Sequence, residues 1–179
     1  MDHGKDGGLD GLFSALGGKW TTSRRLAETI TDAAIAKLDV KAPPCVTATT
    51  KLPGGRFDRF EGLVKGFEKT YPGISSLRHL AHMFGARLPL LLKGAKVSEL
   101  ASLGASGDTA AQITFAVTSE MALTLEDVVM RRTSLGQFGP PANLGAVASI
   151  MAGLLGWDDA RTRAEIESLA PLYQIRDAT

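Results

Sequence analysis

Apolar residues along the chain recur mostly at helical spacing, three or four positions apart. This pattern predicts a helix over 24–38 and further helices over 57–69, 77–84, 90–92, 97–103, a stretch after 108 that carries apolar positions 113, 117 and 121, and then 125–135, 143–155 and 159–169. The apolar run from Leu12 to Leu16 instead predicts the end of a strand, and no partner strand follows it. The predicted fold is mainly α: an orthogonal bundle of about six short helices, preceded by a strand, a turn and a helix.

Residues that begin or end helices support this division. Ser75 and Asp108 are predicted N-caps, and Thr124 with Asp127 forms a capping pair at the start of the next helix. Gly136 and Gly156 are predicted to end the two helices that precede them.

An irregular stretch separates the first helix from the bundle. It contains Pro43-Pro44 and Pro53-Gly54-Gly55, which break both helices and strands. We therefore expect a first segment over residues 1–40, a connector over 41–56 and an all-helical domain over 57–179.

Composition limits the classes of function. Hydrophobic residues make up 44% of the 179-residue chain, which is enough for a core, and the net charge of +1 provides no field for nucleic acid. The single cysteine, Cys45, excludes an internal disulfide. The longest charge-free stretch, Leu144 to Trp157, is shorter than the about 20 residues that span a bilayer, so we expect a cytoplasmic chain.

The turn between the predicted strand and the first helix carries the strongest candidate chemistry. It reads Gly17-Gly18-Lys19-Trp20-Thr21-Thr22, with Thr21 or Thr22 as the N-cap of the helix. Two glycines let the backbone approach a ligand closely, and free N–H groups at a helix start favour an anionic or polar group. The turn is not a phosphate-binding P-loop, because Phe13 stands where that motif requires glycine and Trp20 follows the lysine.

Other clusters have simpler interpretations. His79 and His82 stand three positions apart on one predicted helix, but no third ligand is suitably spaced, so they are interpreted as solvated surface histidines and no metal site is predicted. Cys45 lies beside prolines without a neighbouring base, which predicts an unreactive thiol.

One acid–base cluster could be mistaken for a catalytic group. Its members are Glu120, Glu126, Asp127, Arg131 and Arg132. Because Asp127 and Arg131 have ordinary i, i+4 spacing, the cluster is interpreted as a salt-bridge network between helices.

Several segments resemble the closing part of FAD-dependent glycerol-3-phosphate dehydrogenase. They are Gly11 to Glu28, Thr49 to Gly54, Ser119 to Val128, Arg131 to Gly136 and Leu155 to Asp158, in the order found in that family. The family more often has tyrosine before Arg24, where this chain has Ser23. The family's N-terminal Gly-x-Gly-x-x-Gly fingerprint does not occur here.

The resemblance implies an enzyme that oxidises glycerol 3-phosphate to dihydroxyacetone phosphate, with FAD accepting the hydride and quinone accepting the electrons. It implies that the first strand, turn and helix are the last part of an FAD-binding domain. The implied cofactor-binding residues are Gly17, Gly18, Lys19, Trp20 and Thr21. The Lys19 ammonium is the implied catalytic group, next to the flavin or the substrate phosphate, where a cation stabilises developing negative charge.

The resemblance also implies that the chain is a C-terminal piece whose main partner is an N-terminal FAD domain of the same enzyme. We therefore expect this chain alone to bind no FAD and to catalyse no reaction. The parent is expected at the inner face of the plasma membrane as a peripheral protein, and a homodimer is allowed. The alternative is a stand-alone helical interaction or regulatory module, which the unpartnered strand disfavours. A DNA-binding protein is disfavoured by the near-neutral charge.

Overall fold

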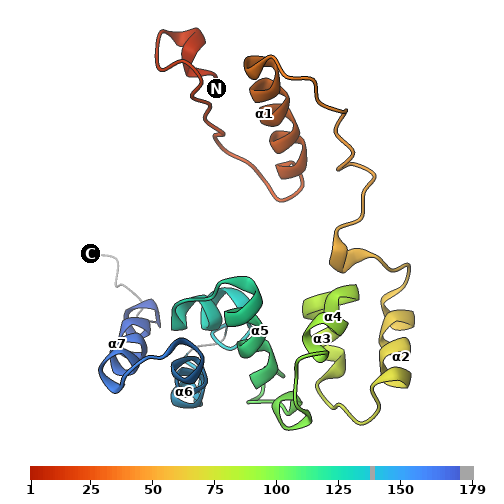
Figure 1. The fold of residues 1–179 in the computed structure, drawn as a ribbon, viewed down its shortest axis with the longest axis vertical. Helices are drawn as coiled ribbons and strands as arrows, with labels where there is room; N and C mark the ends of the chain where they lie inside the picture. The colour runs from red at the N-terminus through yellow and green to blue at the C-terminus, as the bar shows by residue number, and fades with distance from the viewer. Residues whose placement is uncertain (138–139, 174–179) are drawn as a thin grey trace. The chain divides into compact units, whose positions relative to one another are not determined.

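The computed structural model describes residues 1–137 and 140–173. The chain divides into two compact units, residues 1–52 and residues 53–179 (Figure 1). The division falls inside the stretch 41–56 that was predicted to be a connector. The mainly α prediction is confirmed, since helices dominate the described residues and β pairing is confined to isolated bridges.

Unit 1 begins with a short hairpin-like turn around the 3-10 helix η1 (His3–Asp6). Asp2 and Phe13 form an isolated antiparallel bridge, with hydrogen bonds from His3 N to Leu12 O (3.0 Å) and from Ser14 N to the oxygen of residue 1 (3.0 Å). The prediction of a strand without a partner is therefore wrong at Phe13. Its partner precedes it in the chain, because the glycines at positions 7 and 8 let the backbone reverse.

Helix α1 (Ser23–Leu38) begins one residue before the predicted start and follows Thr22, which occupies the N-cap position. No side chain of α1 is buried, and Leu26 and Ile30 on its apolar face are only half-buried. Packing within unit 1 therefore contributes little to the stability of this helix.

Unit 2 contains the remaining helices. They are η2 (Pro53–Gly55), α2 (Phe60–Thr70), α3 (Leu77–Phe84), η3 (Gly85–Arg87), α4 (Leu88–Leu92), η4 (Val97–Leu100), α5 (Ala110–Glu120), the π-helical η5 (Asp127–Arg132), α6 (Leu144–Leu155), α7 (Asp159–Leu169) and η6 (Ala170–Tyr173). The predicted helix 97–103 is thus a single 3-10 turn, and the predicted helix 125–135 contains a π-helical segment.

Two apolar clusters stabilise unit 2. The first, formed by α2 to α4 and the start of α5, has as its most deeply buried members Val64, Leu80, Ala81 and Leu88. The second, formed by α5, η5, α6 and α7, includes Ile113, Leu125, Val128, Val147, Met151 and Leu169. Helix α5 contributes to both clusters, so it connects the two halves of the unit.

A buried carboxylate lies at the junction between these clusters. Asp108 accepts hydrogen bonds from Gln112 Nε2 (3.1 Å) and Ser134 N (3.0 Å) and contacts His79 Nε2 at 2.9 Å. Two predictions are corrected here. Asp108 is not the N-cap of α5, because these donors hold it in the interior and Thr109 takes the cap position. His79 is half-buried against Asp108 rather than solvated.

The other predicted caps have mixed outcomes. The N-cap of α3 is Ser76 rather than Ser75, and its hydroxyl donates to Leu100 O (2.6 Å) instead of capping the helix. The pairing of Thr124 with Asp127 is confirmed, with Asp127 N donating to Thr124 Oγ1 (3.2 Å). Gly156 ends α6 in the left-handed conformation, as predicted, whereas η5 ends at Thr133, before Gly136.

The acid–base cluster is a surface network, as predicted. Arg131 pairs with Asp127 (3.1 Å) and Glu126 (2.5 Å), and Arg132 Nη2 donates to the backbone oxygen of Glu120 (3.0 Å). Partial burial raises the pKa of Asp127. Hydrogen bonds from Thr124 and two backbone N–H groups, together with the charge of Arg131, outweigh that effect and hold the pKa below its usual range.

Within residues 1–137 and 140–173, no helix combines the length and the apolar character that crossing a lipid bilayer requires.

Candidate functional site

The Gly17-Gly18 pair has a backbone conformation that favours glycine. Their φ angles are 75° and 131°. A Cβ at Gly17 would meet no atom within 4 Å, and one at Gly18 would meet only Leu26 Cδ2, at 3.8 Å. No close packing in unit 1 therefore requires glycine here. The glycines set the path of the turn and leave one side of the backbone open.

Hydrogen bonds hold the next residues in a tight turn. Lys19 O accepts from Thr22 N (3.0 Å) and Ser23 N (3.0 Å), and Ser23 Oγ donates to Trp20 O (2.9 Å). The Thr22 hydroxyl accepts from Lys19 N (3.2 Å) and also lies 3.3 Å from Lys19 O. Thr22 is thus the N-cap by position, but its side chain turns back to Lys19 rather than capping the helix.

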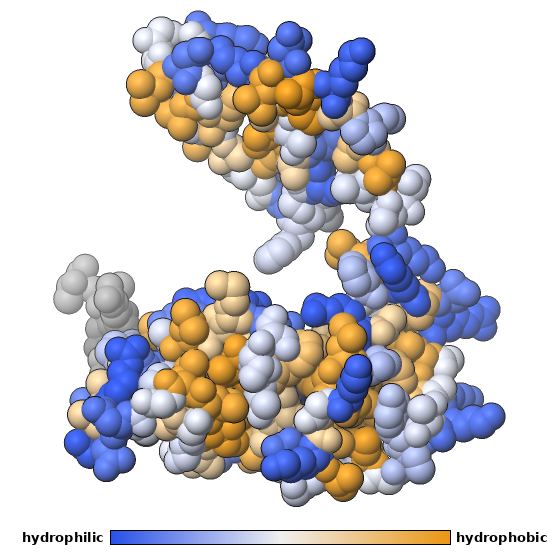
Figure 2. All heavy atoms as spheres, in the orientation of Figure 1, coloured by the Kyte–Doolittle hydropathy of each residue, from blue (hydrophilic) through white to orange (hydrophobic). Residues whose placement is uncertain are grey.

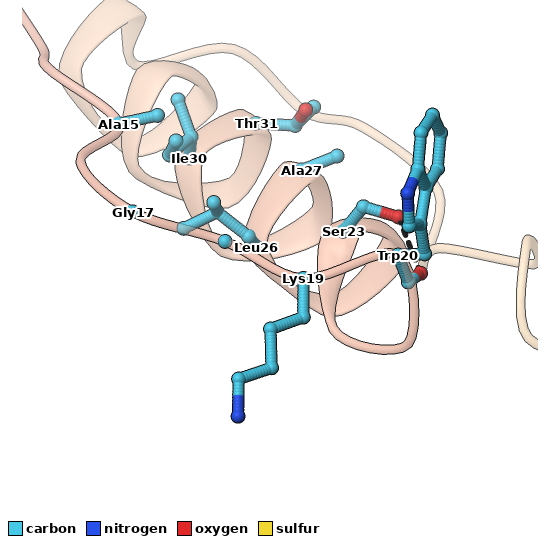
Figure 3. A pocket seen from close by; sticks show the side chains of 10 residues that line it. Ala15, Gly17, Lys19, Trp20, Ser23, Leu26, Ala27, Ile30 and Thr31 are labelled. Atoms are coloured by element: carbon cyan, nitrogen blue, oxygen red, sulfur yellow. Dashed lines mark hydrogen bonds between the residues drawn. The ribbon is translucent and has the colours of Figure 1, made fainter. Parts of the chain in front are cut away.

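Lys19 carries a charge that the described residues leave without a carboxylate partner. In the same unit, Lys5 pairs with Asp2 (3.5 Å), and Lys37 pairs with Asp10, which holds the pKa of Lys37 above its usual range. Figure 3 shows the Lys19 side chain pointing away from α1, with its ammonium at the tip. The ammonium is therefore available to an anion.

An open hollow of about 640 Å³ lies between this turn and one face of α1 (Figure 3). Its lining consists of Ala15, Gly17, Gly18, Lys19, Trp20, Ser23, Leu26, Ala27, Ile30 and Thr31. Among the described residues, no acceptor lies within hydrogen-bond distance of the N–H groups of Gly17, Gly18, Trp20 and Thr21. The hollow thus combines an apolar wall with backbone donors and one cation, which suits a ligand that is part aromatic and part anionic.

A second hollow, of about 880 Å³, lies between α1 and residues 43–52. Arg24 bridges its two sides, with Nη1 at 2.8 Å from Glu28 and 3.2 Å from Thr47. Cys45, on the same stretch, is exposed and contacts Thr47 Oγ1 at 3.0 Å. Figure 2 shows apolar side chains on the surface of unit 1, which agrees with its lack of a buried core.

The structure gathers the five predicted cofactor-binding residues in one turn, and Trp20 is 98% exposed. Sequence reasoning missed the contribution of α1, since Leu26 and Ile30 were interpreted as core positions and instead line the hollow. Their i, i+4 spacing marks an apolar face but does not say what covers it. Within the described residues, no group of three or more histidine, cysteine or acidic side chains could hold a metal ion.

Comparison with known proteins identifies the family. Residues 45–162, more than half of the chain, match the family described as the C-terminal domain of alpha-glycerophosphate oxidase. The chain belongs to this family. The resemblance to glycerol-3-phosphate dehydrogenases is thereby confirmed.

Relatives of this alpha-glycerophosphate oxidase domain are much longer than the chain. Glycerol-3-phosphate dehydrogenase of Synechocystis is 33% identical over 174 residues, which are 93% of this chain and 31% of the relative. The anaerobic glycerol-3-phosphate dehydrogenase of Escherichia coli K12 contains a polypeptide that is 32% identical over 98% of this chain and 31% of its own length. That match includes the Gly17–Thr22 turn, because it omits too few residues to leave the turn out. The chain therefore spans about a third of these curated relatives.

A solved structure shares the fold of this family member. The glycerol-3-phosphate dehydrogenase of Bacillus halodurans, complexed with FAD, is 26% identical, with a TM-score of 0.64 over 89% of this chain and 36% of that one.

Proposed function

We propose that the chain is the C-terminal part of an FAD-dependent glycerol-3-phosphate dehydrogenase. In this proposal residues 1–40 complete the FAD-binding domain, residues 41–56 connect the domains, and residues 57–179 form the helical domain. The observation that carries it is the Gly-Gly-Lys turn, which combines unpaired backbone donors, an unpaired lysine and an open apolar wall. The similarity to longer enzymes named glycerol-3-phosphate dehydrogenase supports it.

The residues of the turn fit a flavin. Glycines at 17 and 18 place no Cβ on the open side, so a flat ring can approach the backbone closely. The apolar face of α1, with Leu26 and Ile30, provides a wall for the ring system. The N–H groups of Trp20 and Thr21 have no protein acceptor among the described residues and can donate to polar atoms of the ring.

FAD would supply hydride acceptance when glycerol 3-phosphate is oxidised to dihydroxyacetone phosphate, with quinone as the final electron acceptor. The part of Lys19 is electrostatic. Its ammonium stabilises negative charge, either on the substrate phosphate or on the ring system beside the turn. Backbone donors at the start of α1 act in the same direction, because the positive end of the helix dipole lies there. Because quinone is dissolved in the bilayer, the parent enzyme would work at the membrane surface as a peripheral protein.

A stand-alone interaction module is the weaker alternative. Such a module would bury its own apolar residues, as unit 2 does with two clusters. In unit 1, no side chain whose burial the structure describes is buried. A 16-residue helix with this little packing is marginal in water, which favours a further domain that covers it.

A chimera tests the proposal. This chain replaces the matching 174-residue segment of the Synechocystis dehydrogenase, and flavin content and glycerol 3-phosphate oxidation with a quinone analogue are measured. We expect bound FAD and turnover in the chimera and neither in the 179-residue chain alone. Lys19→Ala should lower kcat/KM of the chimera by about 100-fold or more, whereas Lys41→Ala, on the connector, should leave it unchanged. A chimera that binds flavin but shows the same kcat/KM with and without Lys19 contradicts the assigned role.

A further inference from the structure

The Thr22 hydroxyl holds the peptide of Lys19 from both ends. It accepts from Lys19 N at 3.2 Å and lies within donating distance of Lys19 O at 3.3 Å. Resting on the proposed function, we propose that Thr22 is a positioning residue that fixes the backbone of Lys19 and so aims its ammonium at the flavin or the substrate phosphate.

Hydrogen bonds, and not packing, determine the shape of this turn. Residues 19–22 are all exposed, and α1 buries none of its side chains in unit 1. A side chain on such a turn points in a defined direction only if its own φ and ψ are fixed. Three donors converge on Lys19 O, namely Thr22 N, Ser23 N and Thr22 Oγ1, and Thr22 also takes the Lys19 N–H. Among the described residues, Thr22 is the only one whose side chain hydrogen-bonds to both polar groups of Lys19's backbone.

The geometry also indicates what Thr22 does not do. A threonine at an N-cap ordinarily accepts from the N–H two or three residues later, which stabilises a helix by about 1 kcal/mol. Thr22 makes no such capping bond. Its hydroxyl is used on the residue that carries the charge, so the helix start is left with free N–H groups.

This assignment divides the donors of the turn between the protein and its ligand. Because Thr22 Oγ1 occupies the Lys19 N–H, Lys19 acts through its ammonium alone. The backbone N–H groups left for the flavin are those of Gly17, Gly18, Trp20 and Thr21. The expected contacts of Lys19 are thereby reduced to its side chain.

The first test uses the full 179-residue chain and does not depend on flavin. Amide hydrogen exchange at Lys19 is followed by NMR in the wild type, Thr22→Val, Thr22→Ser and Thr29→Val. Thr22→Val removes the hydroxyl at nearly constant shape and should accelerate exchange about fivefold, as expected for the loss of one hydrogen bond. Thr22→Ser keeps the hydroxyl and should restore the wild-type rate. Thr29, whose hydroxyl donates to Arg25 O inside α1, is the matched control and should have no effect. Equal exchange in Thr22→Val and the wild type overturns the proposal.

The second test uses the flavin-loaded chimera and measures the two-electron reduction potential of the flavin. Misplacing the ammonium should weaken the preference for the reduced flavin about tenfold, which lowers the potential by about 30 mV. Thr22→Val should show this shift, and Thr22→Ser and Thr29→Val should not. A loaded chimera whose potential is unchanged by Thr22→Val overturns the positioning role. A wild-type chimera that holds no flavin contradicts the proposed function instead, and the exchange experiment then decides about the turn.

Discussion

Gly85 should be the least replaceable glycine of unit 2. It has φ 54° and ψ −135°, a conformation that L-residues with a Cβ rarely adopt. A Cβ built there would lie 2.1 Å from Gly54 O and 2.9 Å from Gly54 C. Both are backbone atoms and cannot rotate away. Gly85→Ala must therefore separate the Pro53–Gly55 turn from the end of α3.

Two terms set the expected magnitude. Holding alanine in this backbone region costs about 1–3 kcal/mol, and relieving the overlap with Gly54 costs about 1–3 kcal/mol more. We expect a loss of about 4 kcal/mol in the free energy of unfolding, out of the about 5–15 kcal/mol that is typical of a domain. For a unit of this size, the loss lowers Tm by about 10–15 °C.

The assay is urea and thermal unfolding of the full chain, followed by far-ultraviolet circular dichroism. Gly94→Ala is the control, because Gly94 has no positive φ and a Cβ there would meet no atom within 4 Å. Gly54→Ala should have an intermediate effect of about 1 kcal/mol, since its Cβ would lie 3.2 Å from Phe84 O. If Gly85→Ala unfolds within 0.5 kcal/mol (about the scatter of surface substitutions) of Gly94→Ala, the close approach of the two turns is refuted.

Three further predictions concern stability. Glu165→Ala should cost about 2–4 kcal/mol, because the buried Glu165 accepts from Leu125 N at 2.7 Å, and the exposed Glu167→Ala should change the unfolding free energy little. Met121→Gly should raise the unfolding free energy by about 0.5–1 kcal/mol, because Met121 ends α5 at φ 58° with its side chain 81% exposed. Since the pKa of Asp127 is lowered in the folded chain, its contribution is present above the unfolded pKa of about 3.9 and is lost as the pH falls toward the lower folded value. The stability difference between the wild type and Asp127→Asn, measured by denaturant titration, should therefore shrink between pH 6 and pH 3.

Features that depend on local sequence were predicted well. The boundaries of α1, α6 and α7 follow from apolar spacing and from residues such as Gly156 and Asp158, which act within one turn of the chain. The pairing of Thr124 with Asp127 is equally local, since the partners are three residues apart.

Features that depend on distant partners were not predicted. Asp108 has the sequence context of an N-cap, yet donors from residues 79 and 134 draw its carboxylate into the interior. The contact between Gly54 and Gly85 joins two turns that are separated by two helices. Neither residue type nor spacing could indicate which donor would reach Asp108, because that depends on how α3 and α5 pack.

The candidate site falls between these cases. Its residues are adjacent in sequence, so the turn, its glycines and its lysine could be found from the sequence alone. The role of α1 could not, because Leu26 and Ile30 have the spacing of core residues and only their partial exposure shows that unit 1 does not cover them. The hydroxyl of Thr22 was likewise expected to cap the helix, and it binds Lys19 instead.

The two units therefore differ in what stabilises them, and this difference bears on function. Unit 2 buries two apolar clusters and a satisfied carboxylate, so its fold is determined by its own residues. In unit 1 the turn is held by hydrogen bonds, while the apolar face next to it is left half-exposed. A binding turn needs this combination, because a ligand or domain that covers the face gains apolar burial without first displacing a packed core. The surface that would stabilise α1 is then the same surface that would bring a flavin to Lys19.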